Sequence, residues 1–169
     1  MMRTTAVAFL VLAAGPSANA QCPLGRIEAA LAAPLDGMKP LERDASEARS
    51  TEGGSWQIYR EKDGRVHSII RIDGGESGRN DTRLSIVDRR TYGIASTRTD
   101  YIRHAFLEGP FANARVTTDY YFFCEGKIYL PDPSASMVDM EKYPKDAEEV
   151  RARMIEDRDV AEFTKGLKR

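Results

Sequence analysis

Residues 55–73 read SWQIYREKDGRVHSIIRID, two runs rich in β-branched and aromatic residues around the dipeptide Asp63-Gly64. This dipeptide favours a hairpin turn, because glycine readily adopts the positive φ angles that such turns require. Side chains in the second run alternate between two faces with the two-residue period of a strand. The stretch therefore predicts a β-hairpin made of Ser55–Glu61 and Val66–Asp73.

A similar sequence pattern continues to about Leu130. Short runs of Ile, Val, Thr, Tyr and Phe recur there between clusters of Gly, Asn and Asp. This pattern is typical of consecutive antiparallel strands, which form a meander. We expect four further strands, at Thr82–Arg89, Tyr92–Arg103, Arg115–Cys124 and Lys127–Leu130. The aromatic run from Tyr120 to Phe123 places rings on both faces of its strand, so we expect that strand to be covered on both faces and to lie inside the sheet.

Helical patterns flank the predicted sheet. Pro23–Ala33 carries apolar residues at helical spacing, which predicts a short amphipathic helix. Residues 35–54 are rich in Pro, Gly, Ser and charge, and we interpret them as a connection. A highly charged stretch at about 145–167 predicts a longer C-terminal helix with a narrow apolar stripe. The predicted fold class is α+β, an antiparallel β-meander of about six strands over residues 55–130 with a helix on either side.

Residues 1–20 have the features of a secretory signal peptide: Arg3, an apolar run from Ala6 to Ala14, and the small-residue pattern Ala18-Asn19-Ala20. Cleavage after Ala20 would leave residues 21–169, the size of a single domain. The apolar run is shorter than the roughly 20 residues that span a bilayer, so we expect no transmembrane segment. The predicted location is periplasmic or secreted, and the sequence does not distinguish the two.

The chain has two cysteines, Cys22 and Cys124. An exported chain reaches an oxidising compartment, where free thiols pair unless something protects them. We therefore expect one disulfide, which closes a loop of about 100 residues. Treated as loop-closure entropy, such a link stabilises the fold by up to about 4.7 kcal/mol.

Composition and motifs exclude several classes of function. The 25 basic and 26 acidic residues nearly balance, so no strong field attracts nucleic acid or an anionic membrane. No run of spaced glycines leads from a strand into a helix, as a nucleotide-binding loop would require. The cysteines are expected to be oxidised and the two histidines show no ligand spacing, so we expect no metal site and no cofactor.

The segment Asp73–Asp81, DGGESGRND, is the most unusual in composition. A calcium loop needs a closing glutamate at its twelfth position, where this chain has Leu84. A nucleophile elbow around Ser77 needs a glycine two residues later, where Arg79 stands. We interpret the segment as a structural connection in which glycines supply unusual backbone angles while Glu76 and Arg79 pair with each other or cap the connection.

Arginine and tyrosine are frequent along the predicted strands, and both are enriched at recognition surfaces. The candidate binding residues are Arg71, Glu76, Arg79, Arg83, Arg98, Tyr101, Arg103 and Tyr121. Exposed strand faces also carry arginine for cross-strand pairing alone, and that interpretation stays open. The leading hypothesis is a small exported binding or inhibitor-like module that uses one sheet face and the Gly74–Asn80 connection. Its partner, a protein or a small molecule, and its oligomeric state are not defined by the sequence.

Two other functions remain as alternatives. A hydrolase would use His67 or His104, the only histidines, with a carboxylate such as Glu76 within about 3 Å. A cell-envelope structural protein would need neither a catalytic group nor a ligand. The small supply of catalytic side chains argues against an enzyme.

Two motifs carry a resemblance to a known group of proteins. They are Gly75-Glu76-Ser77-Gly78-Arg79 and residues 119–128, DYYFFCEGKI. Together they resemble a pattern in uncharacterised exported bacterial β-meander proteins, which have a Gly-Glu-x-Gly-Arg connection and a closing Tyr-Tyr-Phe-x-x-Gly-Lys hairpin. The resemblance covers about Val66–Leu130 and implies the meander. That group has no established activity, so no residue role follows from it.

Overall fold

The computed structural model describes residues 22–46, 53–102, 113–131, 139 and 141–167. Within these residues the chain forms one antiparallel sheet in which strands that follow each other in sequence are neighbours in space. Its seven described strands are β1 (Leu41–Asp44), β2 (Gly54–Arg60), β3 (Val66–Gly75), β4 (Gly78–Asp88), β5 (Thr91–Tyr101), β6 (Asn113–Cys124) and β7 (Lys127–Tyr129). The described helices are α1 (Leu24–Ala32), α2 (Tyr143–Ile155) and α3 (Ala161–Thr164). The predicted α+β meander is confirmed, with one strand more than expected.

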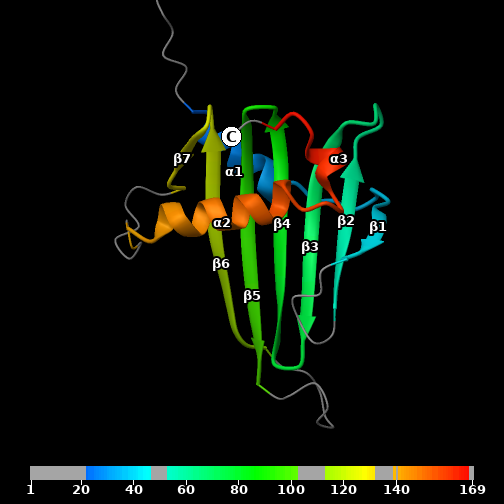
Figure 1. Ribbon diagram of the computed structural model, residues 1–169, viewed down its shortest axis with the longest axis vertical. Helices are drawn as coiled ribbons and strands as arrows, with labels where there is room; N and C mark the ends of the chain where they lie inside the picture. Colours follow the sequence, from blue (N-terminus) through cyan, green and yellow to red (C-terminus); the bar gives the residue numbers. More distant parts are fainter. Residues whose placement is uncertain (1–21, 47–52, 103–112, 132–138, 140, 168–169) are drawn as a thin grey trace, which may run out of the picture.

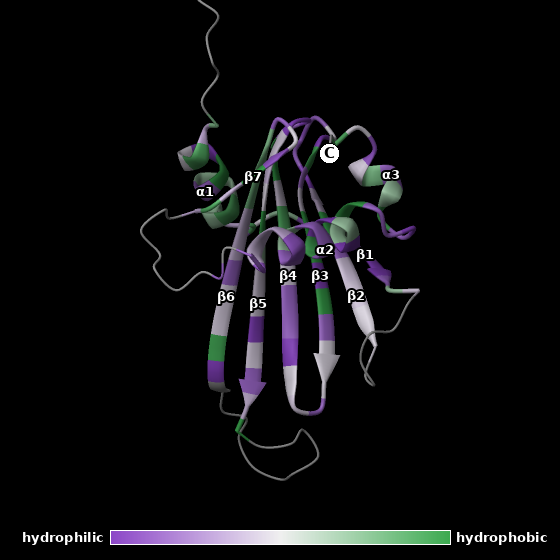
Figure 2. Ribbon diagram, turned by 60° about the vertical axis from the view of Figure 1, so that its left-hand side comes forward, coloured by the Kyte–Doolittle hydropathy of each residue, from purple (hydrophilic) through white to green (hydrophobic). Residues whose placement is uncertain are grey.

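Helices cover part of each face of the sheet. Figure 1 shows α2 crossing the front face and α1 lying behind the sheet. We call these the α2 face and the α1 face. The sheet end that holds the β3–β4 hairpin extends beyond the helices in both views (Figures 1 and 2).

A continuous row of apolar side chains crosses the α2 face and fixes the strand register. Ile58 lies opposite Ile69 and Ile69 opposite Leu84. Leu84 lies opposite Ile94, which in turn lies opposite Tyr121. All five are buried in one core cluster together with residues of α2. A slip of one residue would turn this whole row toward the other face, so the row specifies the meander.

The strand β1 and a break in the C-terminal helix both differ from expectation, and they meet in space. The predicted connection contains β1, and the predicted helix at 145–167 ends at Ile155 before α3 begins. Arg43 of β1 donates to the carbonyl oxygen of Asp159 at 3.0 Å and forms an ion pair with Glu162 at 2.5 Å. The segment between α2 and α3 is thus held against β1 by contacts between residues far apart in sequence, which helical periodicity does not reveal.

The predicted connection at 73–81 is mostly strand. β3 continues to Gly75 and β4 starts at Gly78, so Glu76 and Ser77 alone form the turn. Gly75 and Gly78 are not among the glycines with positive φ. A Cβ on Gly78 would lie 2.4 Å from the carbonyl oxygen of Thr99. This glycine therefore permits close approach of β5, and the expected role in unusual backbone angles is wrong here.

The strand β6 lies inside the sheet over only a short part of its length. It pairs with β5 almost throughout, whereas β7 covers only Phe122–Cys124. Tyr120 remains 43% exposed. The expectation of an interior strand is correct only for these last three residues, whereas the burial of its side chains extends to Tyr121 as well.

The predicted signal peptide, residues 1–20, lies outside the described residues. Among the helices that the structure does describe, none is long and apolar enough to cross a membrane.

Candidate functional site

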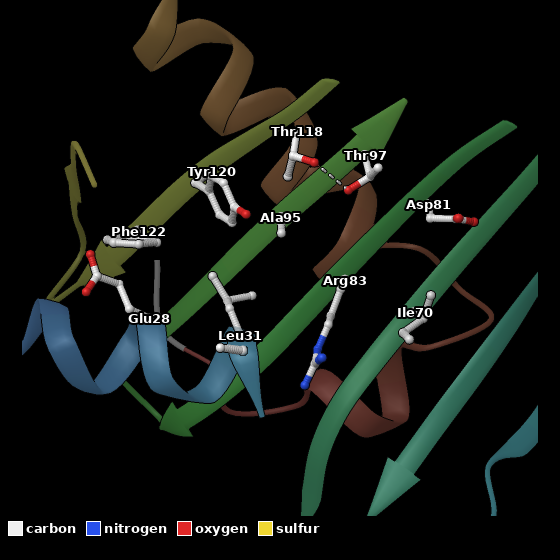
Figure 3. A pocket seen from close by; sticks show the side chains of 11 residues that line it. Glu28, Leu31, Ile70, Asp81, Arg83, Ala95, Thr97, Thr118, Tyr120 and Phe122 are labelled. Carbon is white, nitrogen blue, oxygen red and sulfur yellow. Dashed lines mark hydrogen bonds between the residues drawn. The ribbon is translucent and has the colours of Figure 1, made fainter. Parts of the chain in front are cut away.

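A groove of about 530 Å³ opens on the α1 face beside helix α1, and we call it the α1 groove (Figure 3). Its volume falls within the range of small-molecule sites. Aliphatic and aromatic side chains form most of its wall, namely Leu31, Ile70, Ala95, Tyr120 and Phe122. Such a lining suits an apolar ligand body.

Small residues on β5 create the hollow. Gly93 lies under α1, and a Cβ there would stand 2.5 Å from Cγ2 of Ile27 and 2.8 Å from Cδ1 of Leu31. Ala95 lies two residues further along β5 on the same face. Its short side chain leaves space between β4 and β6, and this space forms the floor of the groove. Gly93 therefore allows α1 to pack closely on β5, and Ala95 leaves the space beside α1 unfilled.

Arg83 joins the groove to the C-terminal end of α1. Its Nη2 donates to the carbonyl oxygens of Ala33 at 2.9 Å and Ala30 at 3.1 Å, and its Nε donates to Oγ of Ser85 at 3.0 Å. Carbonyls at a helix end lack intrahelical donors, so Arg83 acts as a cap for α1. Burial lowers the pKa of Arg83, although a guanidinium stays charged in proteins.

Three charged side chains line the groove, two carboxylates and the guanidinium of Arg83. The carboxylate of Asp81 accepts a hydrogen bond from Nε of Arg79 at 2.6 Å, and Glu28 is exposed on α1. Arg83 makes no ion pair with any described residue, because its hydrogen-bond partners are carbonyl and hydroxyl oxygens. Within the described part of the chain, the groove thus presents one cation without a partner of opposite charge.

Hydroxyl groups add hydrogen-bonding capacity to the floor. Thr97 on β5 and Thr118 on β6 lie opposite each other, with their hydroxyl oxygens 3.0 Å apart (Figure 3). Either hydroxyl can donate to the other or to a bound molecule. The pair lies beside Tyr120 in the groove wall.

A second depression, of about 410 Å³, lies at the sheet end around the β3–β4 hairpin. It is lined by the predicted Gly74–Asn80 segment and by neighbouring residues of β5. Its arginines are already paired along their own strands, Arg79 with Asp81 at 2.6 Å and Arg98 with Asp100 at 2.8 Å. Both arginines of this depression therefore already have carboxylate partners. Because Arg83 has none among the described residues, the α1 groove is the stronger candidate for a ligand site.

The predicted binding residues do not share one face. Arg71 and Tyr121 are buried on the α2 face, and Arg83 lies on the α1 face. Four others gather around the β3–β4 hairpin end, namely Glu76, Arg79, Arg98 and Tyr101. Arg103 lies outside the described residues. The expectation of a single arginine- and tyrosine-rich face is wrong, because the strand register distributes these side chains over both faces.

Arg71 is buried in the sheet and contacts two neighbouring side chains. It is 1% exposed, and its Nε and Nη2 donate to the carboxylate of Asp73 at 2.9 and 2.6 Å. Its guanidinium also lies 4.9 Å from the centre of the Trp56 ring, within the range of a cation–π contact. A side chain enclosed in this way cannot form an exposed recognition surface.

For His67, the one predicted catalytic histidine that the structure describes, the histidine and carboxylate pair expected of a hydrolase is not formed. His67 lies at the start of β3 and Glu76 follows its opposite end. The Nδ1 of His67 lies 3.7 Å from a carboxylate oxygen of Glu61, beyond hydrogen-bond range. His104 lies outside the described residues. Across the described part of the chain, no group of three or more His, Cys, Asp or Glu side chains could hold a metal ion.

The two cysteines lie side by side on the α1 face. Cys22 precedes α1, Cys124 ends β6, and both are buried in the same apolar cluster. Burial, together with a hydrogen bond between the two side chains, raises the pKa of Cys22 to about 12. Both sulfurs are thiols in the structure, so the disulfide stays a prediction.

Sequence reasoning missed most of the groove. Ala95 lies opposite Tyr120, and Thr97 lies opposite Thr118. The small residues of β5 were a signal in the sequence, but their position beside the aromatic run depends on the β5–β6 register. The hollow therefore becomes visible only once that register is known.

No known protein family, curated protein or solved structure matches this chain.

Proposed function

We propose that the protein is a small binding module that holds a small amphiphilic carboxylate in the α1 groove. The observation that carries this proposal is the position of Arg83, a half-buried guanidinium that lines an apolar groove and has only neutral partners among the described residues. A charge removed from water is costly unless a counter-charge accompanies it. A ligand carboxylate would supply that counter-charge through charge-assisted hydrogen bonds.

The rest of the groove supports the same class of ligand. Leu31, Ile70 and Phe122 offer an apolar wall for a hydrocarbon or aromatic body. The hydroxyls of Thr97 and Thr118 offer donors to a polar head group. A volume of about 530 Å³ suits a small molecule rather than a folded partner.

We also propose that binding takes place after export, in the periplasm or outside the cell, with Cys22 and Cys124 joined as a disulfide. The contact between the two cysteines supports this proposal. Such a link would tie α1, which forms one wall of the groove, to β6, which forms another. A hydrolase that uses His67 with Glu76 is not carried further, because the two lie at opposite ends of β3, and His104 lies outside the described residues.

Displacement of the fluorescent probe 1-anilinonaphthalene-8-sulfonate tests the proposal. Decanoate and decanol have the same chain length and differ in their head groups. A charge-assisted hydrogen bond to Arg83 predicts that decanoate displaces the probe at an about tenfold lower concentration than decanol does. Equal displacement by the two would contradict an anionic ligand.

A matched pair of variants locates the binding. Ala95→Leu fills the groove floor and should weaken decanoate binding about tenfold or more. Thr99→Leu adds a similar side chain on the same strand face but outside the groove, and it should leave binding unchanged. Equal effects of the two substitutions would place the ligand elsewhere.

A further inference from the structure

One long edge strand of the sheet has no strand partner over most of its length among the described residues. Among the residues that the structure describes, no strand pairs with the outer side of β6 before Phe122. Figure 1 shows β6 at the border of the sheet, with β7 beside its upper end only. An unpaired edge exposes backbone N–H and C=O groups that can pair with another strand.

The direction of the backbone groups follows from two hydrogen bonds. The N–H of Glu125 donates to the carbonyl oxygen of Arg90 at 2.9 Å. The backbone N–H and C=O groups of the odd-numbered residues of β6 therefore point toward β5. The hydroxyl of Tyr143 donates to the carbonyl oxygen of Tyr120 at 2.9 Å from the outer side. Because backbone direction alternates along an antiparallel strand, Val116 and Thr118 present their N–H and C=O groups outward.

The opposite edge of the sheet is protected, and β6 differs from it. β1 has four residues, three of them charged, and Arg43 ties it to the C-terminal segment. Short, charged edge strands are a common protection against strand pairing. On β6, Val116 is 56% exposed beside the open backbone groups.

We infer that this edge pairs with β6 of a second copy of the chain, antiparallel and around a two-fold axis at Thr117. In this register Val116 lies opposite Thr118 of the second copy, and their outward backbone groups form hydrogen bonds. Arg115 then lies opposite Asp119 of the second copy, and the symmetry makes this ion pair twice. Opposite charges directly across a strand pair are stabilising, and like charges there are destabilising.

Charge complementarity selects both the partner and the register. Arg115 and Asp119 are exposed on the same face of β6, and neither forms an ion pair with another described residue. Asp100 lies opposite Arg115 on β5, but its carboxylate pairs with Arg98 at 2.8 Å. Moving the two-fold axis to the next residue on either side places Arg115 opposite Thr117 or Tyr121 instead. Of these three registers, the one centred on Thr117 is therefore the one that pairs both charges.

The resulting contact is small. It would join the two sheets into one continuous sheet through only a few backbone hydrogen bonds. Contacts of this size are typical of weak association, so we expect a concentration-dependent equilibrium between monomer and dimer. This inference does not depend on the ligand of the α1 groove.

Sedimentation equilibrium of the purified protein, from micromolar to millimolar concentration, tests the inference. Arg115→Asp places like charges opposite each other at both ion-pair positions, and so does Asp119→Arg. Each single variant should raise the dimer dissociation constant about tenfold or more. Asp119 is exposed and lies opposite the neutral Ser96 on β5, so the thermal unfolding midpoint of Asp119→Arg should stay unchanged.

Mixing the two single variants gives the decisive result. Arg115→Asp has acidic residues at positions 115 and 119, and Asp119→Arg has basic residues at both. Each position then lies opposite the other charge, so the mixture should form a heterodimer with at least the affinity of the unmodified protein. The double variant R115D/D119R should also dimerise again. A protein that stays monomeric at millimolar concentration, or a dimer that none of these variants changes, would overturn the inference.

A backbone variant tests the strand pairing itself. Val116→Pro removes an outward N–H without removing a hydrogen bond to β5, and proline is tolerated at edge positions of this kind. It should abolish the dimer, whereas Val116→Thr should retain it. A dimer that persists in Val116→Pro would contradict pairing through β6.

Discussion

Cys22, two residues before α1, and Cys124, the last residue of β6, are buried in one cluster where their thiols interact. The contact lies beside Ile27 and Phe122 in one buried cluster. It joins two of the elements that form the α1 groove. The state of this cysteine pair should therefore affect both the stability of the fold and the seating of α1.

Protein purified from its native compartment should contain a disulfide between Cys22 and Cys124. Its intact mass should be two hydrogens below the reduced value, and reduction should lower the free energy of unfolding by about 2–4 kcal/mol. Cys22→Ala, Cys124→Ala and the double variant should unfold at similar denaturant concentrations, because each lacks the same link. Two free thiols in native material would contradict the disulfide.

The reduced protein should lose stability in alkaline solution. Burial raises the pKa of Cys22 from 9.0 to about 12, so the folded state favours the neutral thiol. This contribution is fully present below pH 9 and is lost as the pH rises toward 12, at up to about 1.4 kcal/mol per pH unit. Urea unfolding between about pH 8 and about pH 10 should show the decline in reduced protein and not in Cys22→Ala. Parallel curves for the two proteins would contradict it.

Gly93→Ala should destabilise the protein by about 1–3 kcal/mol, because the new methyl group overlaps Ile27 and Leu31 and displaces α1. Gly25→Ala is the matched control. No atom lies within 4 Å of a Cβ at Gly25, and alanine in a helix is favoured by about 0.5–1 kcal/mol. Urea unfolding should therefore move in opposite directions for the two variants, and similar stability of both would contradict the seating of α1 on Gly93.

Substitution of Arg83 should separate its structural and ligand-binding roles. Arg83→Met removes the cap of α1 and the charge, and should cost about 1–3 kcal/mol of stability. Arg83→Lys keeps the charge but lacks the fork that reaches two carbonyls. Lysine should retain more of the preference for decanoate over decanol than methionine does, in the displacement assay. Equal loss of that preference in both variants would mean that charge is not what attracts the ligand.

The fold was largely predictable because its signals are local. The Asp63-Gly64 turn and the alternating runs around it predicted the β2–β3 hairpin, which the structure confirms. β1 and the break after Ile155 were missed, because they depend on Arg43 and Asp159, which are far apart in sequence. Local patterns contain no information on such contacts.

The site was much less predictable. Arg83 was among the candidates from the sequence, but its role depends on the end of α1 that packs beside it. Arg71 looked equally suitable and is buried, because the register turns it toward Trp56. The pattern shows which residues of one strand share a face, whereas the alignment of faces between strands, and what covers each face, follow only from tertiary structure.

The most direct test of the binding proposal is a two-dimensional ¹H–¹⁵N NMR titration of the protein with decanoate. Binding in the α1 groove predicts saturable shifts in the amide signals of Ala95, Thr97, Thr118 and Tyr120, around the groove floor. It also predicts unchanged signals from the Gly74–Asn80 segment at the far end of the sheet. Shifts confined to that segment, or no shifts up to millimolar decanoate, would contradict a ligand site in the α1 groove.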